Sequence, residues 1–468
     1  MVSPVANEGQ GFEVLERQPE LTAHQWRVVW LSAIGGMLEF LDGYIIAFVL
    51  AFIIGPWRLQ YGQTAIVLLA SGVGSLLGSF LWGHVADRSG RLPTFIATIC
   101  TCSLGSLALA LTPEGDWILL SVFRFIVGIG VGGFFVPMML VQEFLPQHRR
   151  GQACGIVSAT TAGGLVLGAL SASFLAPVLG WRGMFLVGAL PLFFGVAVYF
   201  LLRESPLWAL ARRRDDLARA SLQWALPPGV TADLHVTGST AAPARWRDVL
   251  SLPRSALNGT LINFGVVTGY YGMVMWSPTL LTQILGIAGD QAAKIMIGVS
   301  LAGVLSRFAI GALSDRFGRR ICGAVAGLLT GAALMGAGLV GHGELLEPRL
   351  FWLPLALSFI FADACVAVLA IYTSEIWPPA VRGRGSGMSY AAGGIGKIIG
   401  PVGFAMLIGS TNVVRPMATV EAMVSSFGFL AAMFVVAGLV YALIGIDARR
   451  PAPLAEPGAL PTTLRAAS

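Results

Sequence analysis

The sequence predicts an all-α membrane protein whose twelve transmembrane helices form two pseudo-symmetric six-helix halves. Three observations lead to this fold class. Hydrophobic residues make up 56% of the 468 residues and charged residues only 12%, whereas soluble domains carry about a quarter charged residues. Apolar runs long enough to cross a bilayer, about 20 residues each, recur along the chain. Two different motifs also recur half a chain later, in the same order.

The apolar runs fall into two sets of six. The first set covers 28–54, 65–86, 92–112, 117–144, 151–179 and 184–202, and the second covers 255–281, 289–313, 321–341, 349–374, 383–409 and 419–446. The expected domains are therefore a bundle at 28–202, a polar linker at 203–254 and a bundle at 255–446. Terminal segments at 1–27 and 447–468 flank them. The basic start of the linker is expected to form an interfacial helix that tethers the halves, and its Pro- and Gly-containing run at 227–243 breaks any helix.

The recurring motifs define the repeat. A G-x-x-x-D-R-x-G-R segment returns at an offset of 228 residues, and an E-x-x-P-x-x-x-R-G segment at an offset of 232. Two parallel halves explain this, with a cavity between them that opens to either side as the halves rock. The gating candidates in the motifs are Gly83, Asp87, Arg88, Arg91, Glu143 and Arg150 in the first half, and Gly311, Asp315, Arg316, Arg319, Glu375 and Arg382 in the second.

Each G-x-x-x-D-R-x-G-R segment lies where one spanning helix ends and the next begins. We expect a charged, water-facing hinge there, in which Gly83 and Gly311 let two helices approach closely and the second glycine supplies the turn. Glu143 and Glu375 lie at helix ends beside the loop arginines. We expect these two carboxylates to latch the gate in one state.

Arginine placement predicts the orientation. With the N-terminus inside, the inner segments hold 22 basic residues and the outer segments hold 5. Both termini and the linker are therefore expected to be cytoplasmic, in a multi-pass protein of the plasma or inner membrane. The first 25 residues are polar and of mixed charge, which predicts no cleavable signal peptide.

Other classes of function find no support in the sequence. The net charge is +6, but the basic residues lie between apolar runs rather than on one face, so nucleic-acid binding is not expected. The five cysteines have no metal-ligand spacing and are expected to be small core residues. No nucleotide-binding signature and no set of nucleophile, base and orienting residue is present. We expect no cofactor, no metal and no enzyme activity.

Charges within spanning helices are expensive and are therefore functional candidates. Glu39 and Asp42 share a face of the first span. A carboxylate removed from water can bind and release a proton near neutral pH, which proton coupling requires. The alternative is that one acid forms only a structural ion pair. Arg124 lies in the fourth span, and Arg307 in the eighth is expected to be structural.

Two charged residues of the second half leave alternatives open. Asp363 lies midway along the tenth span and Lys397 in the middle of the eleventh. They could neutralise each other, or Lys397 could receive a substrate carboxylate. The rings of Tyr270, Tyr271 and Trp276 in the seventh span could stack on a planar ligand, or they could belong to the core or an interfacial belt.

With these motifs the sequence resembles the major facilitator superfamily, whose loops between helices 2 and 3 and helices 8 and 9 carry the G-x-x-x-D-R-x-G-R segment. The run from Arg124 to Gly133 is similar to the superfamily's R-x-x-x-G-x-G-x-G-G motif. The resemblance implies that Arg124 partners a carboxylate of helix 1, here Asp42 or Glu39. The run around Asp42 resembles the D-G-Y-D signature of aromatic-acid and related metabolite:proton symporters, with Ile45 at the second aspartate. The run from Tyr270 resembles their Y-Y-G-x-x-x-W-x-P-T-L.

The expected function is that of a secondary active transporter. It would import a small organic anion, such as an aromatic acid, together with protons. Asp42, Glu39 and Arg124 would couple the proton, while Lys397, Asp363 and the three rings would bind the substrate. The expected partners are the small-molecule substrate, protons and the lipid bilayer, and the protein is expected to be a monomer. Proton-driven efflux of a hydrophobic compound, or a non-transporting membrane sensor on the same scaffold, are the alternatives.

Overall fold

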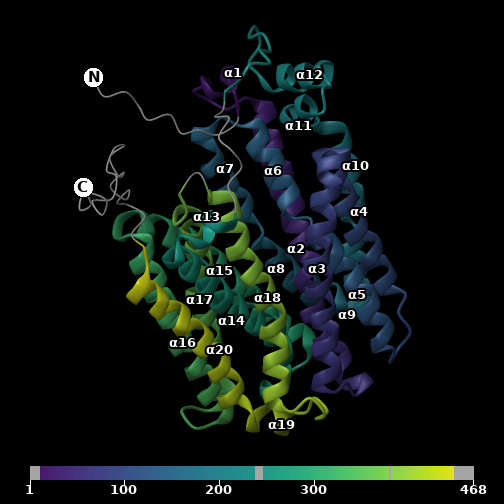
Figure 1. Ribbon diagram of the computed structural model, residues 1–468. Helices are drawn as coiled ribbons and strands as arrows, with labels where there is room; N and C mark the ends of the chain where they lie inside the picture. The colour runs from purple at the N-terminus through teal and green to yellow at the C-terminus, as the bar shows by residue number, and fades with distance from the viewer. Residues whose placement is uncertain (1–10, 238–245, 379–380, 447–468) are drawn as a thin grey trace, which may run out of the picture.

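The computed structural model describes residues 11–237, 246–378 and 381–446 as two side-by-side helical bundles (Figure 1). The bundle of the first half, hereafter the N half, contains α2 Ala23–Trp57, α3 Tyr61–Ser89, α4 Arg91–Ala110, α5 Trp117–Val131, α6 Phe135–Phe144, α7 Gln147–Thr160, α8 Gly163–Phe174, α9 Ala176–Ala189 and α10 Pro191–Leu201. The bundle of the second half, the C half, contains α14 Pro253–Leu285, α15 Gly289–Phe317, α16 Arg319–His342, η1 Pro348–Leu350, α17 Trp352–Glu375, α18 Arg382–Ile408, α19 Pro416–Glu421 and α20 Met423–Ile444.

Three predicted spans of the N half are each divided into two helices. The fourth becomes α5 and α6, which are separated at residues 132–134, where the last two motif glycines, Gly132 and Gly133, lie. The fifth becomes α7 and α8, and the sixth becomes α9 and α10, with Pro191 at the start of the second piece. Because Pro lacks an N–H and clashes with the preceding turn, it is favoured at a helix start and breaks a helix interior.

Eleven helical segments in the described ranges are long and apolar enough to cross a membrane. The twelve predicted spans correspond to these eleven segments and to α14. Helix α14 is long enough to cross a membrane but is less apolar than the others. This helix buries Asn258 and Asn263, together with Tyr270, against its neighbours. Because α14 packs against α18, α20, α2 and α17, these polar groups are bonded within the protein rather than exposed to lipid.

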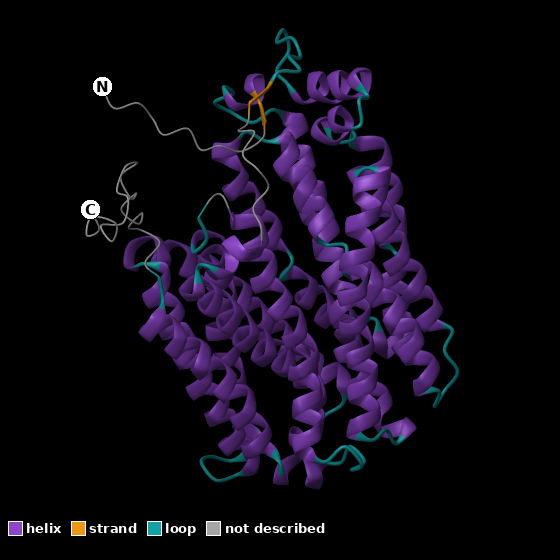
Figure 2. Ribbon diagram, in the orientation of Figure 1, coloured by secondary structure: helices purple, strands orange, loops and turns teal. Residues whose placement is uncertain are grey.

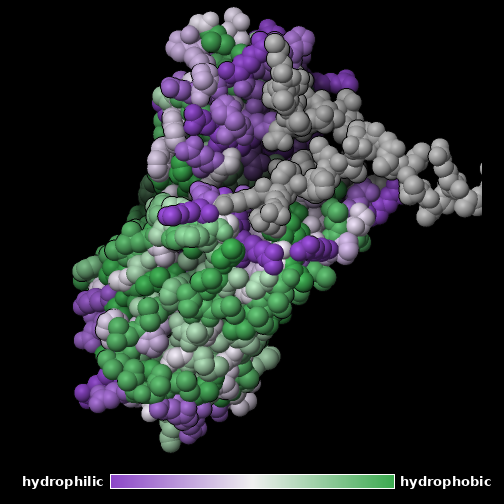
Figure 3. All heavy atoms as spheres, turned by 90° about the vertical axis from the view of Figure 1, so that its left-hand side faces the viewer, coloured by the Kyte–Doolittle hydropathy of each residue, from purple (hydrophilic) through white to green (hydrophobic). Residues whose placement is uncertain are grey.

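The surface of the bundles is apolar around the middle and polar at the ends (Figure 3). Large hydrophobic side chains are exposed there, among them Leu305 and Phe308 on α15 and Ile321 on α16, at 61%, 64% and 59% of their full accessibility. A soluble protein would bury side chains of this kind. Their exposure around the bundle is what contact with lipid requires.

The linker and the segment before α2 form a polar cap at one end of the N half. Two short strands, β1 Gly11–Phe12 and β2 Val236–Thr237, pair antiparallel there, and α1 Glu13–Glu16, α11 Pro206–Ala211 and α12 Asp215–Ala225 lie beside them (Figures 1 and 2). We call this end of the molecule the linker face and the opposite end the α19 face. A further short helix, α13 Trp246–Leu250, contacts α14 and α18 of the C half.

The cap is held to the N half by specific contacts. The Thr22 hydroxyl donates to the Ala225 carbonyl at 2.8 Å, and His24 stacks on Trp224 with ring centroids 4.5 Å apart. Helices α11 and α12 contact α6 and α2. The expected interfacial tether is thus a folded unit, of which α11 and α12 are docked on one half and α13 contacts the other.

Candidate functional site

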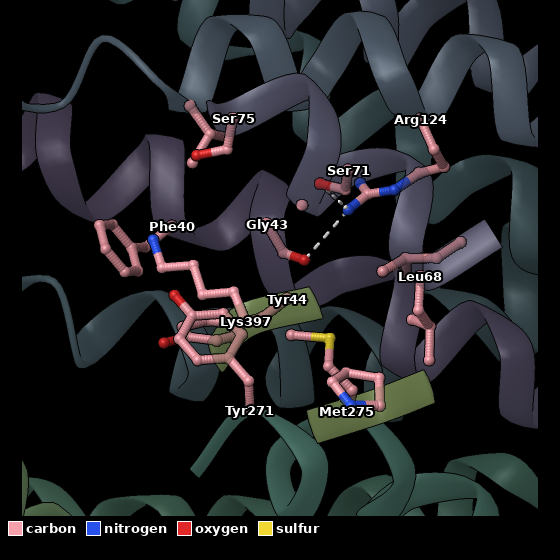
Figure 4. Close-up of a pocket in the computed structure, with 14 residues that line it drawn as sticks. Phe40, Gly43, Tyr44, Leu68, Ser71, Ser75, Arg124, Tyr271, Met275 and Lys397 are labelled. Atoms are coloured by element: carbon pink, nitrogen blue, oxygen red, sulfur yellow. Dashed lines mark hydrogen bonds between the residues drawn. The ribbon is translucent and has the colours of Figure 1, made fainter. Parts of the chain in front are cut away.

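A pocket lies between the two halves, midway along the bundles (Figure 4). Five helices line it: α2, α3 and α5 of the N half face α14 and α18 of the C half. The lining residues are Phe40, Gly43, Tyr44, Ile46, Leu68, Ser71, Gly72, Ser75, Arg124 and Val131 from the N half, and Tyr271, Met275, Lys397 and Pro401 from the C half. The site therefore combines two cations with aromatic rings, a composition that suits a planar anion.

Arg124 is held in the pocket wall by main-chain and hydroxyl oxygens. One terminal nitrogen donates to the Asp42 carbonyl at 2.8 Å, and the other donates to the Gly43 carbonyl at 3.2 Å and to Ser71 Oγ at 3.0 Å (Figure 4). Arg124 as a whole is only 1% exposed. Its planar fork can satisfy these separate acceptors at once, which the single ammonium of a lysine cannot do.

The predicted pairing of the Arg124 side chain with the carboxylate of Asp42 or Glu39 is wrong in this conformation. Asp42 Oδ1 instead accepts a hydrogen bond from Ser106 at 2.8 Å, and Glu39 Oε1 accepts one from Thr98 at 2.9 Å. Both hydroxyls belong to α4, because the face of α2 that carries the acids packs inside the N half. The acids share one helix face, as expected from their spacing, but neither is among the residues that line the pocket.

The surroundings of the two acids are almost closed. Asp42 is fully buried and Glu39 is 2% exposed. At Gly188 of α9, a Cβ atom would lie 2.1 Å from Asp42 Oδ1, so only glycine leaves room for the carboxylate. Asp42 Oδ2 and Glu39 Oε2 have no hydrogen-bond partner among the described residues. An unpaired buried charge costs far more free energy than a neutral carboxyl group at the same place.

In the C half, the structure brings Lys397 and Tyr271 together in the pocket. Lys397 Nζ lies 5.2 Å from the centroid of the Tyr271 ring, and the Tyr271 and Tyr44 centroids lie 6.3 Å apart across the halves (Figure 4). Within the described part of the chain, Lys397 forms no ion pair. The alternative in which Lys397 and Asp363 neutralise each other is wrong, because Asp363 pairs with Arg307 at 2.5 Å.

The other predicted substrate residues lie outside the pocket lining. Tyr270 donates its hydroxyl to Asp363 at 3.2 Å, within the C half. Trp276 is fully buried, donates to the Pro401 carbonyl at 3.1 Å and stacks on Phe404 with centroids 5.4 Å apart. Helix α14 turns these neighbouring aromatic residues toward different partners, which adjacency in the sequence does not reveal.

The gate residues form the same arrangement in both halves. Arg91 lies between Asp87 at 3.0 Å and Glu143 at 3.3 Å. At the equivalent place in the C half, Arg319 lies between Asp315 at 2.5 Å and Glu375 at 3.5 Å. Both clusters are at the linker face, where α3 meets α4 and α15 meets α16. The motif charges thus pair within their own half in this conformation.

The remaining gate candidates are more scattered. Arg150 pairs with Glu16 of α1 at 3.1 Å, Arg88 is exposed, and Arg316 lies 5.5 Å from the centroid of the Phe317 ring. Arg382 begins α18, and its side chain lies outside the described part of the structure.

The expected close approach at the first motif glycine is wrong in this conformation. A Cβ atom on Gly83 would meet only Phe135 at 3.8 Å, and one on Gly311 would meet nothing within 4 Å. The turn glycines behave as expected, since Gly90 and Gly318 have φ of 109° and 97°. Close packing occurs instead at Gly128, where a Cβ would lie 2.3 Å from the Ser71 carbonyl oxygen.

Glu204 of the linker is a gate contact that the sequence analysis missed. Its Oε1 accepts hydrogen bonds from the main-chain N–H groups of Arg91 at 2.8 Å and Ser205 at 2.7 Å, and it thereby caps the N-terminus of α4. Burial raises the pKa of this carboxyl, and the main-chain hydrogen bonds oppose the shift. Trp208 of α11 adds a bond from its indole N–H to the Asp87 carbonyl at 3.0 Å. The available signal was the R-E-S-P-L-W run at 203–208, where the linker begins.

The two halves are clasped at the α19 face by residues 59–62 and 410–414. Leu59 lies in the connection between α2 and α3, and Tyr61 is the first residue of α3. Both side chains are buried in this contact. We call this contact the α19-face clasp. Its main-chain hydrogen bonds run from Tyr61 N to Asn412 O (2.9 Å), from Gly62 N to Ser410 O (2.8 Å) and from Val414 N to Leu59 O (3.0 Å).

Comparison with known proteins decides the family. The family model of the Major Facilitator Superfamily matches residues 32–401 and 261–466. The chain belongs to the Major Facilitator Superfamily. It is 30% identical over 384 residues to the niacin transporter NiaP of Acinetobacter baylyi, an alignment that covers 81% of this chain and 86% of NiaP. It is 24% identical over 432 residues to the cis,cis-muconate transport protein of the same organism, covering 92% and 95%.

The fold agrees with this membership. The crystal structure of a D-xylose–proton symporter superposes with a TM-score of 0.71 at 18% identity, covering 91% of this chain and 99% of the symporter. The predicted fold class of the superfamily is thereby confirmed. This superfamily member is a membrane transporter and not an enzyme.

Proposed function

We propose that this transporter moves a small organic carboxylate, of the planar and conjugated kind, together with protons. The observation that supports the substrate class is that two cations, Lys397 and Arg124, line one pocket. The walls of this pocket also carry the rings of Phe40, Tyr44 and Tyr271. A carboxylate matches the cations, and a flat π system matches the rings. Niacin and cis,cis-muconate, which the relatives are named for, are acids of this kind.

The two cations would hold the anion from opposite halves. Arg124 belongs to the N half and Lys397 to the C half, so a carboxylate between them would favour the state in which the halves are closed on it. In an alternating-access transporter the substrate has to be bound by both halves at the point of exchange. Lys397 has no ion pair in the described structure, so its ammonium group is available to bind the substrate carboxylate.

Asp42 is the proposed proton carrier. It lies next to the Arg124 contact, since Arg124 donates to the carbonyl of the same residue. Proton binding at Asp42 would change the field at Arg124 without any contact between the proton and the substrate. Glu39 shares the face and is the second candidate, with Thr98 in place of Ser106 as its donor.

The linker face is proposed to be cytoplasmic, because the arginines of both gate clusters lie there and basic residues favour the inner side. The α19-face clasp would then close the outer side, and the structure would represent a conformation with the outer gate shut. Both gates and the pocket lie within one chain, so we propose that the monomer transports.

The test is uptake by the purified protein in liposomes that enclose a pH-sensitive dye. With an inward proton gradient, we expect nicotinate and benzoates to acidify the interior faster than in protein-free liposomes, which control for leakage of the neutral acids. Sugars and aliphatic amines should give the same internal pH in liposomes with and without the protein.

The Asp42→Asn variant keeps an acceptor for Ser106 but cannot carry a proton. We expect it to lose the acidification while still exchanging labelled nicotinate for unlabelled nicotinate across the membrane. Glu39→Gln is the variant to compare with Asp42→Asn, because both acids lie on the same face of α2. If no acid moved protons and a cationic drug instead drove proton exit, the proposal would give way to efflux by antiport.

A further inference from the structure

The C half contains a buried ion pair that the proposed mechanism does not use. Arg307 of α15 and Asp363 of α17 are joined through Nη2 at 2.5 Å and Nε at 2.7 Å, both to Asp363 Oδ1. Their side chains are 9% and 4% exposed. A buried pair is costly to desolvate unless additional hydrogen bonds complete it, so its remaining partner is informative.

That partner is Tyr270 of α14. Its hydroxyl donates to Asp363 Oδ1 at 3.2 Å and accepts from Arg307 Nη2 at 3.2 Å. The phenol therefore bridges the two charges and can satisfy both only in one position. Three helices, α14, α15 and α17, meet at this hydroxyl.

The carboxylate has little freedom to follow Tyr270 if that residue moves. A Cβ atom at Gly303 of α15 would lie 2.2 Å from Asp363 Oδ2, so the backbone of α15 packs directly on the carboxylate. Buried charge networks of this kind are rigid when every member is bonded. The position of Tyr270 is thus defined by two neighbouring helices.

Tyr270 is followed directly by Tyr271, which faces the pocket. Consecutive residues of an α-helix point about 100° apart, as 3.6 residues make one turn. Fixing the direction of Tyr270 therefore fixes that of Tyr271 and of Met275, one turn later on the same face. Both line the pocket, and Lys397 lies over the Tyr271 ring (Figure 4). The Tyr270 and Tyr271 rings also pack edge to face at 6.0 Å.

We propose that Tyr270, held by Arg307 and Asp363, is a positioning residue that sets the rotation of α14 and so directs Tyr271 and Met275 into the substrate pocket. The inference rests on the proposed function, in which this pocket binds the anion. Tyr270 itself does not touch the substrate. It acts through the residue that follows it.

Two conservative variants test the inference, because removing the charge of Arg307 or of Asp363 could prevent folding. Tyr270→Phe removes only the bridging hydroxyl. Gly303→Ala removes no polar group, but its methyl displaces Asp363. The matched controls are Tyr441→Phe, a buried C-half tyrosine whose hydroxyl has no partner among the described residues, and Gly298→Ala on the same helix α15, where a Cβ would meet nothing within 4 Å. Size-exclusion profiles verify that each variant is folded.

The first readout does not depend on transport. The substitution Met275→Cys is made in a background without the five native cysteines. The reaction rate of its thiol with a small water-soluble maleimide reports whether this face of α14 points into the pocket. We expect Tyr270→Phe and Gly303→Ala to slow the reaction several-fold, and both controls to leave it unchanged. Unchanged rates in the two test variants would overturn the inference.

The second readout is the KM for nicotinate uptake, which we expect to rise about tenfold in both test variants with the maximal rate retained, corresponding to about 1.4 kcal/mol. A purely structural role would lower the amount of folded protein but not change KM. Slowed labelling with an unchanged KM would overturn the link to binding. If the unmodified protein moves no anion at all, the proposed function fails, and the labelling rates alone decide whether Tyr270 positions α14.

Discussion

Arg124 binds Asp42 through the main chain: its guanidinium donates to the Asp42 carbonyl at 2.8 Å, while the Asp42 carboxylate turns to Ser106 on α4. The cation and the acid are thus neighbours without being an ion pair in this conformation. The arginine faces the pocket and the carboxylate faces the interior of the N half. A movement of the Asp42 carboxylate can therefore affect Arg124 through the main chain of Asp42, and a movement of Arg124 can affect the carboxylate in the same way.

This geometry predicts that charge alone does not replace Arg124. Lysine keeps the charge but cannot bond the two carbonyls and Ser71 together. We expect Arg124→Lys to raise the KM for nicotinate at least tenfold, by loss of more than one hydrogen bond of about 1 kcal/mol each. Ser71→Ala removes one of these bonds and should raise KM only a few-fold. Equal KM values for Arg124→Lys and the unmodified protein would contradict the proposed role.

Lys397 is predicted to supply the second positive charge to the anion. Lys397→Gln keeps most of the side-chain length but removes the charge, and a charge-assisted hydrogen bond contributes about 1.5 to 3 kcal/mol. We expect KM for nicotinate to rise about 10- to 100-fold, measured by initial uptake rates in liposomes. Lys294→Gln is the control, because Lys294 lies at the surface near the start of α15 and pairs with Asp290. A neutral analogue, nicotinamide, should not distinguish Lys397→Gln from the unmodified protein.

The α19-face clasp is predicted to open during each transport cycle. Gln60 and Val413 form an antiparallel bridge across the two halves, and directly opposed residues of such a pair have Cα atoms about 4.5 to 5.5 Å apart, within disulfide range. We expect the double variant Gln60→Cys with Val413→Cys to be inactive when oxidised and active again after reduction. Each single variant should be active under both conditions. Full activity of the oxidised double variant, with the disulfide verified by mass spectrometry, would show that the clasp need not open.

The Glu204 cap gives a prediction for stability. Its carboxylate replaces the missing partners of main-chain N–H groups at the start of α4, and loss of a helix N-cap costs about 1 kcal/mol. We expect Glu204→Ala to lower the unfolding temperature of the detergent-solubilised protein. The control is Asp233→Ala in the linker, whose side chain is exposed and, among the described residues, bonds only within its own loop. An unfolding temperature unaffected by Glu204→Ala would mean that the cap is dispensable.

The pH dependence of this cap has a definite sign. Burial raises the pKa of Glu204 in the folded protein above its unfolded value. Its titration therefore contributes stability that is fully present below the unfolded pKa and is lost as the pH rises through the folded pKa. Glu204→Gln cannot titrate. We expect the unmodified protein to gain stability relative to Glu204→Gln as the pH falls from neutral to mildly acidic, in thermal unfolding measured at each pH. The opposite trend would contradict the raised pKa.

The repeated motifs were enough to predict the gate clusters in outline. Arg91 and Glu143, and their counterparts Arg319 and Glu375, meet in the same way in each half, because equivalent positions of a duplicated bundle have equivalent neighbours. Glu204 could not be placed by this logic, because the linker occurs once and has no second copy. Its contact with α4 depends on how the cap folds back on the N half.

The sequence by itself determined that the protein is surrounded by lipid, how many spans to expect and which superfamily the chain resembles. The apolar length of each run indicates a spanning helix, and the repeated motifs indicate two related halves. Only the tertiary structure decided which charge pairs with which. The sequence offered Lys397 as a partner for Asp363, whereas packing of α15 against α17 gave Asp363 Arg307 and left Lys397 to the pocket. The rotation of each helix about its axis selects between neighbours such as Tyr270 and Tyr271, and that rotation is fixed by side-chain contacts between helices distant in the chain.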